Sequence, residues 1–531
     1  MVYWCKKCGV PIFDRELHEC TCDGSVVKIS ESSICNPVFR QEKKLLSKIA
    51  DENLMGKELW YLGGSNYYYD GKINRISYRD WYKEKKHLQC ADELRCEIEL
   101  EDYDNYQKVV QANETYIKNA IFEAEQYIHE TVAKYPIPDY IPTISFSGGK
   151  DSSVVSRLVM DTLQTDSIIH FFGDTTLEFP ETYEYVRGGF RRENPRAALI
   201  PSETENDFFK LCNVFGPPSQ HERWCCTIFK TSNLNKEFDN LPGKSLTFLG
   251  IRHSESVARS KYERTQEESK ISSQVTAMPI ITWKDYDVWL YILYKNMTVN
   301  PCYQYGYKRV GCWCCPNNSE WSMMLTEIYH PGHMKRWKDM VYEFAIKTGK
   351  DDPDDYYEEG RWRTRRGASG LKVRNVSITD TPCNLSDKAR NIIIEKKISK
   401  DAIELFKPLG DLKIIEKKDS TYISIYDYDK SNEYRKVCEL IIKFGTNVIK
   451  VLPEDRIDAT NLVNRIKCQM RKYQFCIRCT ACDSTCPNGA IDTIHGKYHI
   501  DEEKCTHCKH CIAKFYNGCI MCDVLSAKKE S

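Results

Sequence analysis

The alternation of apolar and polar residues divides the chain into strand-like and helix-like segments. Residues 141–146 form an extended apolar segment, and residues 153–160 repeat apolar side chains at helical spacing. The two patterns alternate over residues 141–330, which predicts a parallel sheet with crossover helices and therefore an α/β fold. Upstream, a helical pattern over residues 106–134 ends before Pro136, because proline cannot continue a helix.

The segments that flank this region have other patterns. Residues 31–105 contain aromatic, strand-like pieces around a Gly-Gly-Ser-Asn turn, which predicts a small β-rich module with a hairpin. Residues 331–470 mix helical patterns with a β-like run at residues 421–426 and form a linker or accessory domain. Both ends of the chain are rich in cysteine. The predicted domains are residues 1–30, 31–105, 106–330, 331–470 and 471–531.

The charge balance and the apolar runs narrow the class of protein. With 76 basic and 76 acidic residues the formal net charge is zero, so charge does not support nucleic acid as a partner, although it does not exclude it. The chain has no run of about 18 or more apolar residues, which argues against a membrane-spanning helix. Its first residues lack the apolar core of a signal peptide. We therefore expect a cytoplasmic protein without a membrane partner.

The 26 cysteines point to metal chemistry. Disulfides are rare in a reducing cytosol, whereas clustered Cys-x-x-Cys spacing is typical of metal sites. The N-terminal group predicts a zinc ribbon whose Zn²⁺ ligands are Cys5, Cys8, Cys20 and Cys22. Cys35 is an alternative ligand, and a rubredoxin-like iron site is the alternative to zinc.

A loop suited to phosphate follows the strand-like segment 141–146. Two glycines allow the backbone to approach an anion closely, and the helix behind them presents free amide groups at its N-terminus. Lys150 adds a mobile cation, whereas the alternative is an ordinary glycine-rich turn between a strand and a helix. The predicted nucleotide-binding residues of the loop are Ser145, Ser147, Gly148, Gly149, Lys150, Asp151 and Ser152.

The loop Ser-Phe-Ser-Gly-Gly-Lys-Asp-Ser is not a Walker loop and resembles the PP-loop of the ATP-pyrophosphatase superfamily. Three further segments, at residues 171–183, 250–259 and 279–289, resemble segments of phosphoadenosine phosphosulfate (PAPS) reductases in the same order. Four matches in order are far more specific than one. This third of the chain is therefore identified as similar to the PAPS reductase-like family.

The resemblance implies a nucleotide-dependent enzyme of sulfur metabolism, and the residue chemistry agrees with it. Arg252 and Arg259 can each bind sulfate or phosphate oxygens with two N–H groups. Asp174 follows a predicted strand, where open α/β sheets bind ligands, and can hold a ribose or Mg²⁺ or cap the next turn. The predicted catalytic residues are Lys150, Asp151, Arg252 and Arg259. The three cations among them would stabilise the charge that develops on the reacting anionic groups.

Cysteines of the nucleotide domain resemble the [4Fe–4S] signature of adenylyl-sulfate reductases and some related sulfur-transfer enzymes. The predicted ligands are Cys225, Cys226, Cys312 and Cys315. Cys314 is a departure from this signature, so either Cys314 or Cys315 can supply the last ligand. A zinc site is the alternative.

The C-terminal segment has the cysteine spacing of a bacterial two-cluster ferredoxin, in which the fourth cysteine of each run binds the other cluster. One predicted [4Fe–4S] set is Cys486, Cys505, Cys508 and Cys511. The other set is Cys476, Cys479, Cys482 and Cys519. Phe515 stands where its fourth cysteine is expected, so Cys522 is an alternative to Cys519. Such a module carries single electrons, whereas a zinc knuckle would not.

Two departures separate the chain from sulfonucleotide reductases. Those enzymes attack sulfate sulfur with a cysteine in a Glu-Cys-Gly-[Leu/Ile]-His segment that this sequence lacks. Cys383, Cys438 and Cys468 are nucleophile candidates only by elimination, and each has the alternative of a buried structural cysteine. The PP-loop is also intact, as in relatives that cleave ATP. Both departures favour ATP as the nucleotide.

An arginine-rich segment lies further along, with Arg361, Arg363, Arg365 and Arg366 around Trp362. It can bind phosphates or stack on a base. Six acidic residues just upstream favour the alternative of a charged, solvated surface.

The sequence leads to one main hypothesis and two alternatives. The main hypothesis is ATP pyrophosphatase activity, in which adenylylation of an oxygen precedes sulfur transfer. The first alternative is a true PAPS or adenylyl-sulfate reductase that releases sulfite, and the second is a non-catalytic nucleotide and redox sensor. The expected cofactors are two C-terminal [4Fe–4S] clusters, one more in the PP-loop domain, Zn²⁺, and either ATP with Mg²⁺ or a sulfonucleotide. The expected partners are an external electron donor and an unidentified sulfur donor or acceptor.

Overall fold

The computed structural model describes residues 1–13, 20, 22, 24–202, 206–267, 274–371, 378–428, 431–493 and 497–525. The chain divides into two compact units. Unit 1 comprises Met1–Ser202, Leu241–Ser269 and Gln274–Lys338. Unit 2 comprises Glu203–Asn240, Lys270–Ser273 and Asp339–Ser531. Residues 203–240 fall within the α/β domain proposed from the sequence, yet they group with the C-terminal half of the chain.

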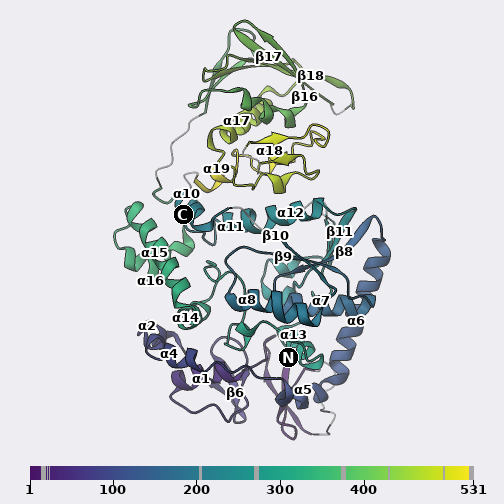
Figure 1. Ribbon diagram of the computed structural model, residues 1–531, viewed down its shortest axis with the longest axis vertical. Coiled ribbons are helices and arrows are strands. Elements are labelled where there is room, and N and C mark those ends of the chain that lie inside the picture. Colours follow the sequence, from purple (N-terminus) through teal and green to yellow (C-terminus); the bar gives the residue numbers. More distant parts are fainter. Residues whose placement is uncertain are drawn as a thin grey trace. The chain divides into compact units, whose positions relative to one another are not determined.

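A six-stranded sheet forms the centre of unit 1 (Figure 1) and confirms the predicted α/β class. Its order is β10-β9-β8-β11-β13-β12, and all neighbours are parallel except β12 and β13. The strands are β8 (Tyr140–Phe146), β9 (Ile169–Gly173), β10 (Ala198–Ser202), β11 (Lys244–Phe248), β12 (Thr265–Gln266) and β13 (Gln274–Ala277).

The strand order reverses at β8. The chain continues from β8 through β9 to β10 on one side, and then resumes with β11 on the other side of β8. Open parallel sheets bind ligands at the carboxyl ends of the strands that flank such a reversal. The carboxyl ends of β8 and β11 are therefore where the fold favours a ligand.

Helices α6, α7 and α13 of unit 1 pack against one another, and α7 also packs along β8. The buried side of α7 carries Val154, Val155, Leu158 and Val159, as the helical spacing predicts. The helix predicted over residues 106–134 appears as two consecutive helices, α5 and α6. The helices of this region are α5 (Gln107–Ala112), α6 (Glu114–Lys134), α7 (Lys150–Leu163), α8 (Pro180–Glu184), α9 (Phe190–Glu193), α13 (Asp285–Tyr294), α14 (Glu320–Tyr329) and α15 (Pro331–Lys347), whose last residues belong to unit 2.

The N-terminal part of unit 1 contains two small antiparallel sheets. One has the order β2-β1-β3, with β1 (Val2–Cys5), β2 (Val10–Ile12) and β3 (Val26–Ser30). The other has the order β4-β5-β6-β7, with β4 (Asn36–Pro37), β5 (Trp60–Tyr61), β6 (Asn66–Tyr69) and β7 (Lys72–Arg75). The turn between β5 and β6 is the Gly-Gly-Ser-Asn turn of the predicted hairpin.

The same segment also contains helices that the aromatic, strand-like pattern did not reveal. They are α1 (Arg40–Ala50), α2 (Arg79–Lys83), α3 (Lys86–Gln89) and α4 (Ala91–Cys96). The longest of them, α1, buries Leu45 and Leu46 between charged residues, a helical pattern that the neighbouring tyrosines and tryptophans obscure.

In unit 2, residues 206–240 form three short helices that pack with the segment after α15. The three helices are α10 (Phe208–Phe215), α11 (Trp224–Cys226) and α12 (Ser232–Asp239), and the segment after α15 contains α16 (Pro353–Glu358). Arg365 is 3% exposed, and its guanidinium donates to the carbonyls of Phe215, Pro217 and Gly367. Arg365 therefore connects the arginine-rich segment to residues 215–217 by hydrogen bonds, and this part of the segment is not a solvated surface.

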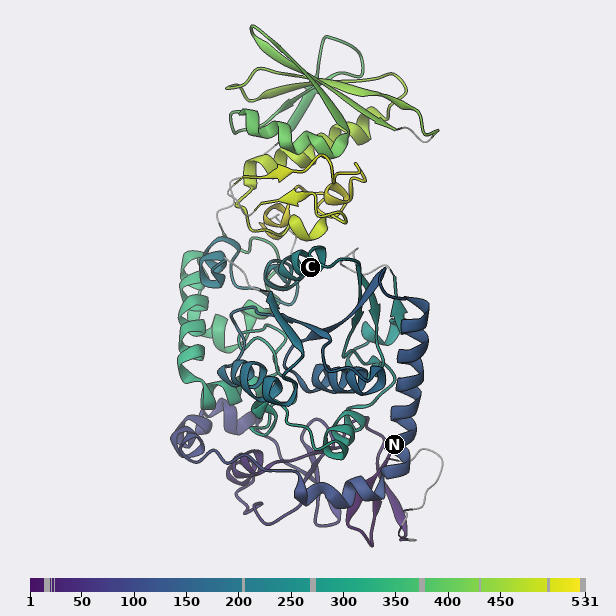
Figure 2. The same ribbon diagram turned by 45° about the vertical axis from the view of Figure 1, so that its right-hand side comes forward.

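A six-stranded antiparallel sheet occupies the C-terminal half of unit 2, in the order β14-β15-β19-β18-β17-β16. Helix α17 and the 3₁₀ helix η8 lie between this sheet and the cysteine-rich module (Figure 2). The elements are β14 (Thr379–Pro382), β15 (Arg390–Ile393), η8 (Lys400–Leu409), β16 (Asp411–Lys417), β17 (Ser420–Tyr428), β18 (Tyr434–Ile442), β19 (Val448–Pro453), α17 (Ala459–Phe475), β20 (Ile491–Asp492), β21 (His499–Ile500), α18 (His510–Ala513) and α19 (Ile520–Leu525). Among the described residues, no helix has the length and apolar character needed to cross a membrane.

Candidate functional site

The PP-loop connects β8 to α7 through a turn that requires glycine. Gly148 has φ +68°, and a Cβ atom there would lie 2.8 Å from Val186 Cγ2 and 3.0 Å from Thr182 Cγ2. Both the backbone conformation and the close packing therefore exclude a side chain. Ser152 Oγ accepts from the Ser147 amide at 3.2 Å, and the Ser147 and Ser152 hydroxyls are hydrogen-bonded to each other at 3.2 Å. The two serine hydroxyls are thus partly engaged within the loop that the sequence expected them to offer to phosphate.

Four charged side chains meet at the start of α7. Lys150 is 3% exposed, and its Nζ lies 2.9 Å from both Asp151 Oδ2 and Asp285 Oδ1. Arg252, 4% exposed, places Nε 2.6 Å from Asp151 Oδ1 and a terminal nitrogen 2.7 Å from Asp285 Oδ1. We call Lys150, Asp151, Arg252 and Asp285 the charge ring.

The members of the charge ring hold one another ionised. Burial alone raises the pKa of Asp285, but the positive charges of Lys150 and Arg252 outweigh it and keep that pKa below its usual range. Burial alone lowers the pKa of Lys150, and the two carboxylates more than reverse the effect. Two cations and two anions therefore persist at neutral pH, and their charges sum to zero.

Three neighbours support the ring and the loop. The Tyr303 hydroxyl accepts from the Lys150 amide at 2.9 Å, and Asn36 Nδ2 donates to Asp285 Oδ2 at 2.5 Å. A Cβ on Gly250 would lie 2.7 Å from the Asp151 carbonyl, so this glycine lets the strand end of β11 approach α7.

The sequence contains a signal for only some of the residues that form and support the ring. Asp285 lies inside the PAPS reductase-like segment 279–289, which could have identified it. Asn36 and Tyr303 carry no local signal. Their role follows from contacts with residues more than a hundred positions away in the sequence.

Arg259 and Asp174 stand apart from the charge ring. The Arg259 guanidinium pairs with Glu255, which is not a member of the ring. Asp174 follows β9 and is 7% exposed; its Oδ1 accepts from the Thr176 amide at 2.8 Å and from the Tyr183 hydroxyl at 2.6 Å. The carboxylate therefore caps its turn, the alternative role that the sequence left open.

The N-terminal cysteines form a compact group. The Sγ atoms of Cys5, Cys8, Cys20 and Cys22 all lie within 4.8 Å of one another. A Cβ on Gly24 would lie 2.8 Å from Cys5 Sγ and 2.9 Å from Cys22 Sγ, so glycine leaves room beside the sulfurs. Four thiolates at such spacing suit one tetrahedral ion, and the group does not include Cys35.

The cysteines of the predicted central cluster lie in two units. Cys225 and Cys226 belong to unit 2, and Cys312 and Cys315 belong to unit 1. A hydrogen bond with Cys225, helped by the charges of Arg223 and Lys230, lowers the pKa of Cys226 to about 5, so this thiol favours the thiolate form that binds metals.

Cys314 and Cys315, the two candidates for the last ligand of that cluster, differ in their burial. Cys314 is 4% exposed and packs in the core, whereas Cys312 and Cys315 are both partly exposed. Buried cysteines also belong to both proposed C-terminal sets, so burial alone does not select Cys315 over Cys314 as a ligand.

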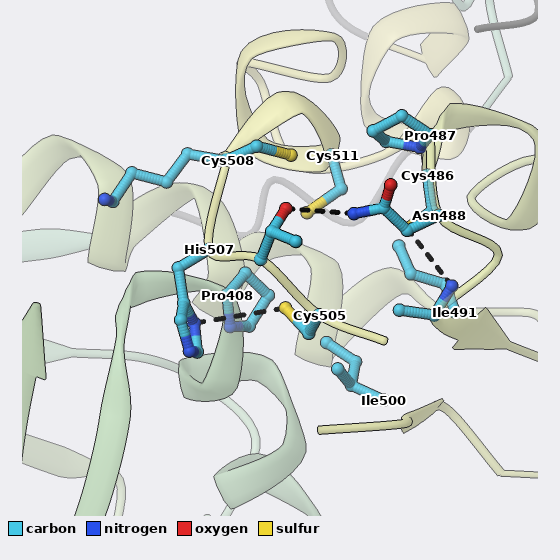
Figure 3. Close-up of a pocket in the computed structure, with 13 residues that line it drawn as sticks. Pro408, Cys486, Pro487, Asn488, Ile491, Ile500, Cys505, His507, Cys508 and Cys511 are labelled. Atoms are coloured by element: carbon cyan, nitrogen blue, oxygen red, sulfur yellow. Dashed lines mark hydrogen bonds between the residues drawn. The ribbon is translucent and has the colours of Figure 1, made fainter. Parts of the chain in front are cut away.

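One C-terminal cysteine set surrounds a single cavity (Figure 3). The thiols of Cys486, Cys505, Cys508 and Cys511 line it together with apolar residues that include Pro408, Ile491 and Ile500. The donor set and the apolar walls fit an iron–sulfur cluster. In the other set, Cys482 and Cys519 are buried, and Cys519 Sγ lies 3.7 Å from Cys522 Sγ, so both alternatives for the fourth ligand lie together.

Comparison with known proteins agrees with the fold. Residues 141–318 match the family model of the phosphoadenosine phosphosulfate reductase domain. An uncharacterized protein of Methanocaldococcus jannaschii is 31% identical over 266 residues, which are 49% of this chain and 54% of that relative. The adenosine 5'-phosphosulfate reductase of Staphylococcus epidermidis is 26% identical over 223 residues, 41% of this chain and 86% of the reductase. The chain thus spans about half the length of the first relative and more of the second.

Solved structures give weaker matches. The phosphoadenylyl-sulfate reductase of Candida auris, in a phosphate complex, has a TM-score of 0.29 and 17% identity, and covers 41% of this chain and 98% of that one. A Candida glabrata FMN adenylyltransferase with FAD and pyrophosphate has a TM-score of 0.31 and 17% identity, over 43% of this chain and 71% of that one. TM-scores this low do not establish a shared fold or function. The family model and the sheet order place a PAPS reductase-family domain at residues 141–318.

Proposed function

We propose that the chain is a cytoplasmic iron–sulfur enzyme of sulfur metabolism that adenylylates an oxygen of its substrate with ATP before sulfur transfer. The charge ring supports this reaction. Its two cations suit phosphate oxygens, and its two carboxylates supply the oxygen ligands that Mg²⁺ prefers. A polyphosphate with Mg²⁺ engages both kinds of group, whereas a sulfonucleotide alone would compete with the carboxylates for Lys150 and Arg252 and would bring no cation of its own.

In the adenylylation step, an oxygen of the acceptor forms a bond to the α-phosphorus of ATP. The bond between the α-phosphorus and the bridging oxygen breaks, and pyrophosphate leaves with the electron pair. Lys150 and Arg252 would stabilise the charge that develops on the phosphate oxygens, and Asp151 and Asp285 would hold Mg²⁺. A sulfide donor then forms a bond to the carbon that bears the activated oxygen, and AMP leaves with the electron pair as the carbon–oxygen bond breaks.

The remaining predicted sites of this proposal are cysteine sets. The N-terminal group would hold Zn²⁺, and the three other sets would hold [4Fe–4S] clusters. When bound, the clusters supply one-electron transfer. The cavity lined by four thiols and the thiolate character of Cys226 support this assignment.

Reduction of adenylyl sulfate is the second candidate, and the reductase relatives favour it. Two electrons would break the bond between sulfur and the phosphate oxygen, releasing sulfite and AMP. The nucleophile candidates named from the sequence count against this reaction: Cys383, Cys438 and Cys468 are all buried, and burial raises the pKa of Cys438 to about 12.

Anaerobic turnover of the reconstituted protein tests both candidates. The protein receives chemical reductant and either ATP with a cell extract as the source of acceptor, or PAPS or adenylyl sulfate. Pyrophosphate release from ATP without sulfite supports adenylylation, and sulfite release from a sulfonucleotide replaces it with reduction. Nucleotide binding without either product supports the sensor hypothesis.

Two substitutions make the assay specific. K150Q removes a cation of the charge ring and should lower turnover by roughly 10²–10³-fold, the usual effect of losing one group that stabilises charge in a transition state. K295Q removes a surface cation that pairs with Asp161 and should leave turnover unchanged. Unchanged turnover in K150Q would show that the observed turnover does not arise at the PP-loop.

A further inference from the structure

Lys472, on α17, is a buried cation without a carboxylate partner among the described residues. Its side chain is 0% exposed. Nζ donates to the backbone carbonyl of Cys511 at 3.4 Å and lies 5.5 Å from the centre of the Tyr498 ring. A buried ammonium group costs several kcal/mol unless an anion compensates it.

The groups around Lys472 that can carry negative charge are thiols from both C-terminal cysteine sets. Lys472 interacts electrostatically with Cys482 and Cys519 of one set and with Cys511 of the other, and also with Cys468 on its own helix. Helix α17 packs against both α18 and α19. The lysine is therefore placed where the two sets approach the same helix.

A glycine allows one of these approaches. Gly518 precedes Cys519 and has φ +125°; a Cβ there would lie 2.7 Å from Arg471 Cβ and 3.2 Å from the Lys472 amide. The turn that delivers Cys519 to α17 therefore has no space for a side chain.

Neutral thiols would leave the Lys472 charge uncompensated, whereas an iron–sulfur cluster bound by four thiolates is anionic. Its negative charge grows by one when the cluster accepts an electron. A fixed positive charge nearby consequently stabilises the reduced cluster more than the oxidised one, and net charge is one of the factors that set the potential of such clusters.

We propose that Lys472 is a counter-charge shared by the two C-terminal clusters and that it raises the reduction potential of both. This inference rests on the proposed iron–sulfur function. The lysine acts as a positioning and tuning residue, because its contacts reach the cysteine sets and none of its contacts is a residue of the charge ring. Each cluster would take one electron from an external one-electron donor, pass it on and return to its oxidised state.

The test compares full-length variants that are reconstituted anaerobically. K472M removes the charge and keeps a long apolar stem, and K472R keeps the charge. K467M removes a lysine from the same helix that pairs with Asp380 and so serves as the matched control. Iron and sulfide content is measured first, and a redox titration followed by electron paramagnetic resonance then gives the midpoint potentials. Signals that disappear in a C479A/C508A double variant belong to the C-terminal clusters.

We expect K472M to lower both midpoints, by at least a tenfold change in the reduction equilibrium, which is about 59 mV for a one-electron couple. K472R and K467M should remain near the wild-type values. Iron loss in K472M but not in K472R would also support a shared counter-charge.

Three results would overturn the inference: unchanged midpoints in K472M, a shift confined to one cluster, or iron loss in K472M and K472R alike. The last result would show that the lysine matters for packing and not for charge. A wild-type protein that holds no C-terminal clusters would instead remove the proposed iron–sulfur function itself, so the two failures are distinguishable.

Discussion

At the residue scale, the charge ring explains how four ionised side chains remain stable at a largely buried site. Each cation of the ring contacts both carboxylates, so no charge is left without a partner. Removing one member would leave an uncompensated charge in a poorly solvated place, which costs more than the lost contact alone. A phosphate ligand bound at the ring would share these cations with the carboxylates.

A substitution in the backbone turn of the PP-loop tests the proposed phosphate site more specifically than the removal of a charge does. G148A should weaken nucleotide binding by about tenfold, because a left-handed residue with a Cβ costs about 1–2 kcal/mol and the Cβ also contacts Val186. Titration calorimetry with ATP and Mg²⁺ measures the change. G188A is the control, because a Cβ there meets nothing within 4 Å. Equal affinities for the two variants would contradict the proposed phosphate site.

Buried His170 should make unit 1 sensitive to acid. Burial lowers the pKa of His170 to about 4, while Ser156 and the Ile168 carbonyl hold its ring. The unfolded chain therefore binds the proton more readily than the folded one below about pH 6.5. Above that pH His170 is neutral in both states and does not lower the free energy of unfolding. As the pH falls towards 4, protonation of the unfolded chain at this histidine lowers the free energy of unfolding progressively.

H170Q removes this titrating group. The melting temperature of the wild type should fall more steeply between pH 7 and pH 5 than that of H170Q, with a contribution on the order of 2 kcal/mol at the lower pH. Differential scanning fluorimetry across that range compares the two proteins. Parallel pH profiles would exclude His170 as the source of the acid sensitivity.

At the element scale, the first turn of α13 connects the N-terminal sheets to the charge ring. The Asp285 amide donates to the Ser33 carbonyl at 3.1 Å, and Asn36 holds the Asp285 side chain. The next residue, Tyr286, stacks on Phe13 with ring centres 4.5 Å apart. Contacts with Phe13, Ser33 and Asn36 thus orient a carboxylate of the candidate site.

Asn36 is therefore expected to act as a positioning residue for Asp285. N36A should raise the KM for the nucleotide by about tenfold, since hydrogen bonds to charged groups contribute about 1.5–3 kcal/mol, and should change kcat less. N53A alters an exposed asparagine of the same segment and should leave both constants unchanged. Unchanged KM in N36A, with normal circular dichroism, would show that Asp285 does not need this contact.

At the scale of the whole molecule, the cysteine sets predict separable metal sites. The wild-type protein should contain about one zinc and about twelve iron atoms, from one tetrahedral site and three four-iron clusters. C8S should lose the zinc and keep the iron, whereas C508S should lose about four iron atoms and keep the zinc. Elemental analysis by mass spectrometry measures both.

The outcome separates the alternatives that the sequence left open. Iron in place of zinc, lost in C8S, would identify a rubredoxin-like N-terminal site. Zinc lost in C508S would identify a zinc knuckle at the C-terminus and remove the electron-carrying module from the proposed function.

Prediction from the sequence succeeded where the signal was local. Four predicted features depend on spacing within a few turns of chain, and the structure contains each of them. They are the strand–loop–helix arrangement around the PP-loop sequence, the helical segment 106–134 (as α5 and α6), the hairpin around its Gly-Gly-Ser-Asn turn and the N-terminal cysteine group. The helices between residues 40 and 96 escaped notice because aromatic residues dominate the same segment. The hydrogen bonds of Arg365 escaped notice because their carbonyl acceptors lie mostly about 150 positions earlier.

The sequence by itself determined the α/β class, the glycine turn between β8 and α7 and the N-terminal cysteine group, because backbone periodicity, glycine and closely spaced metal ligands act over short distances. Only the tertiary structure decided which charges face one another. Parallel strands bring their carboxyl ends to one edge of the sheet, so Lys150, Arg252 and Asp285 meet although more than 130 residues separate the first from the last. The same holds for Lys472, whose neighbours come from both cysteine sets once the chain folds around α17.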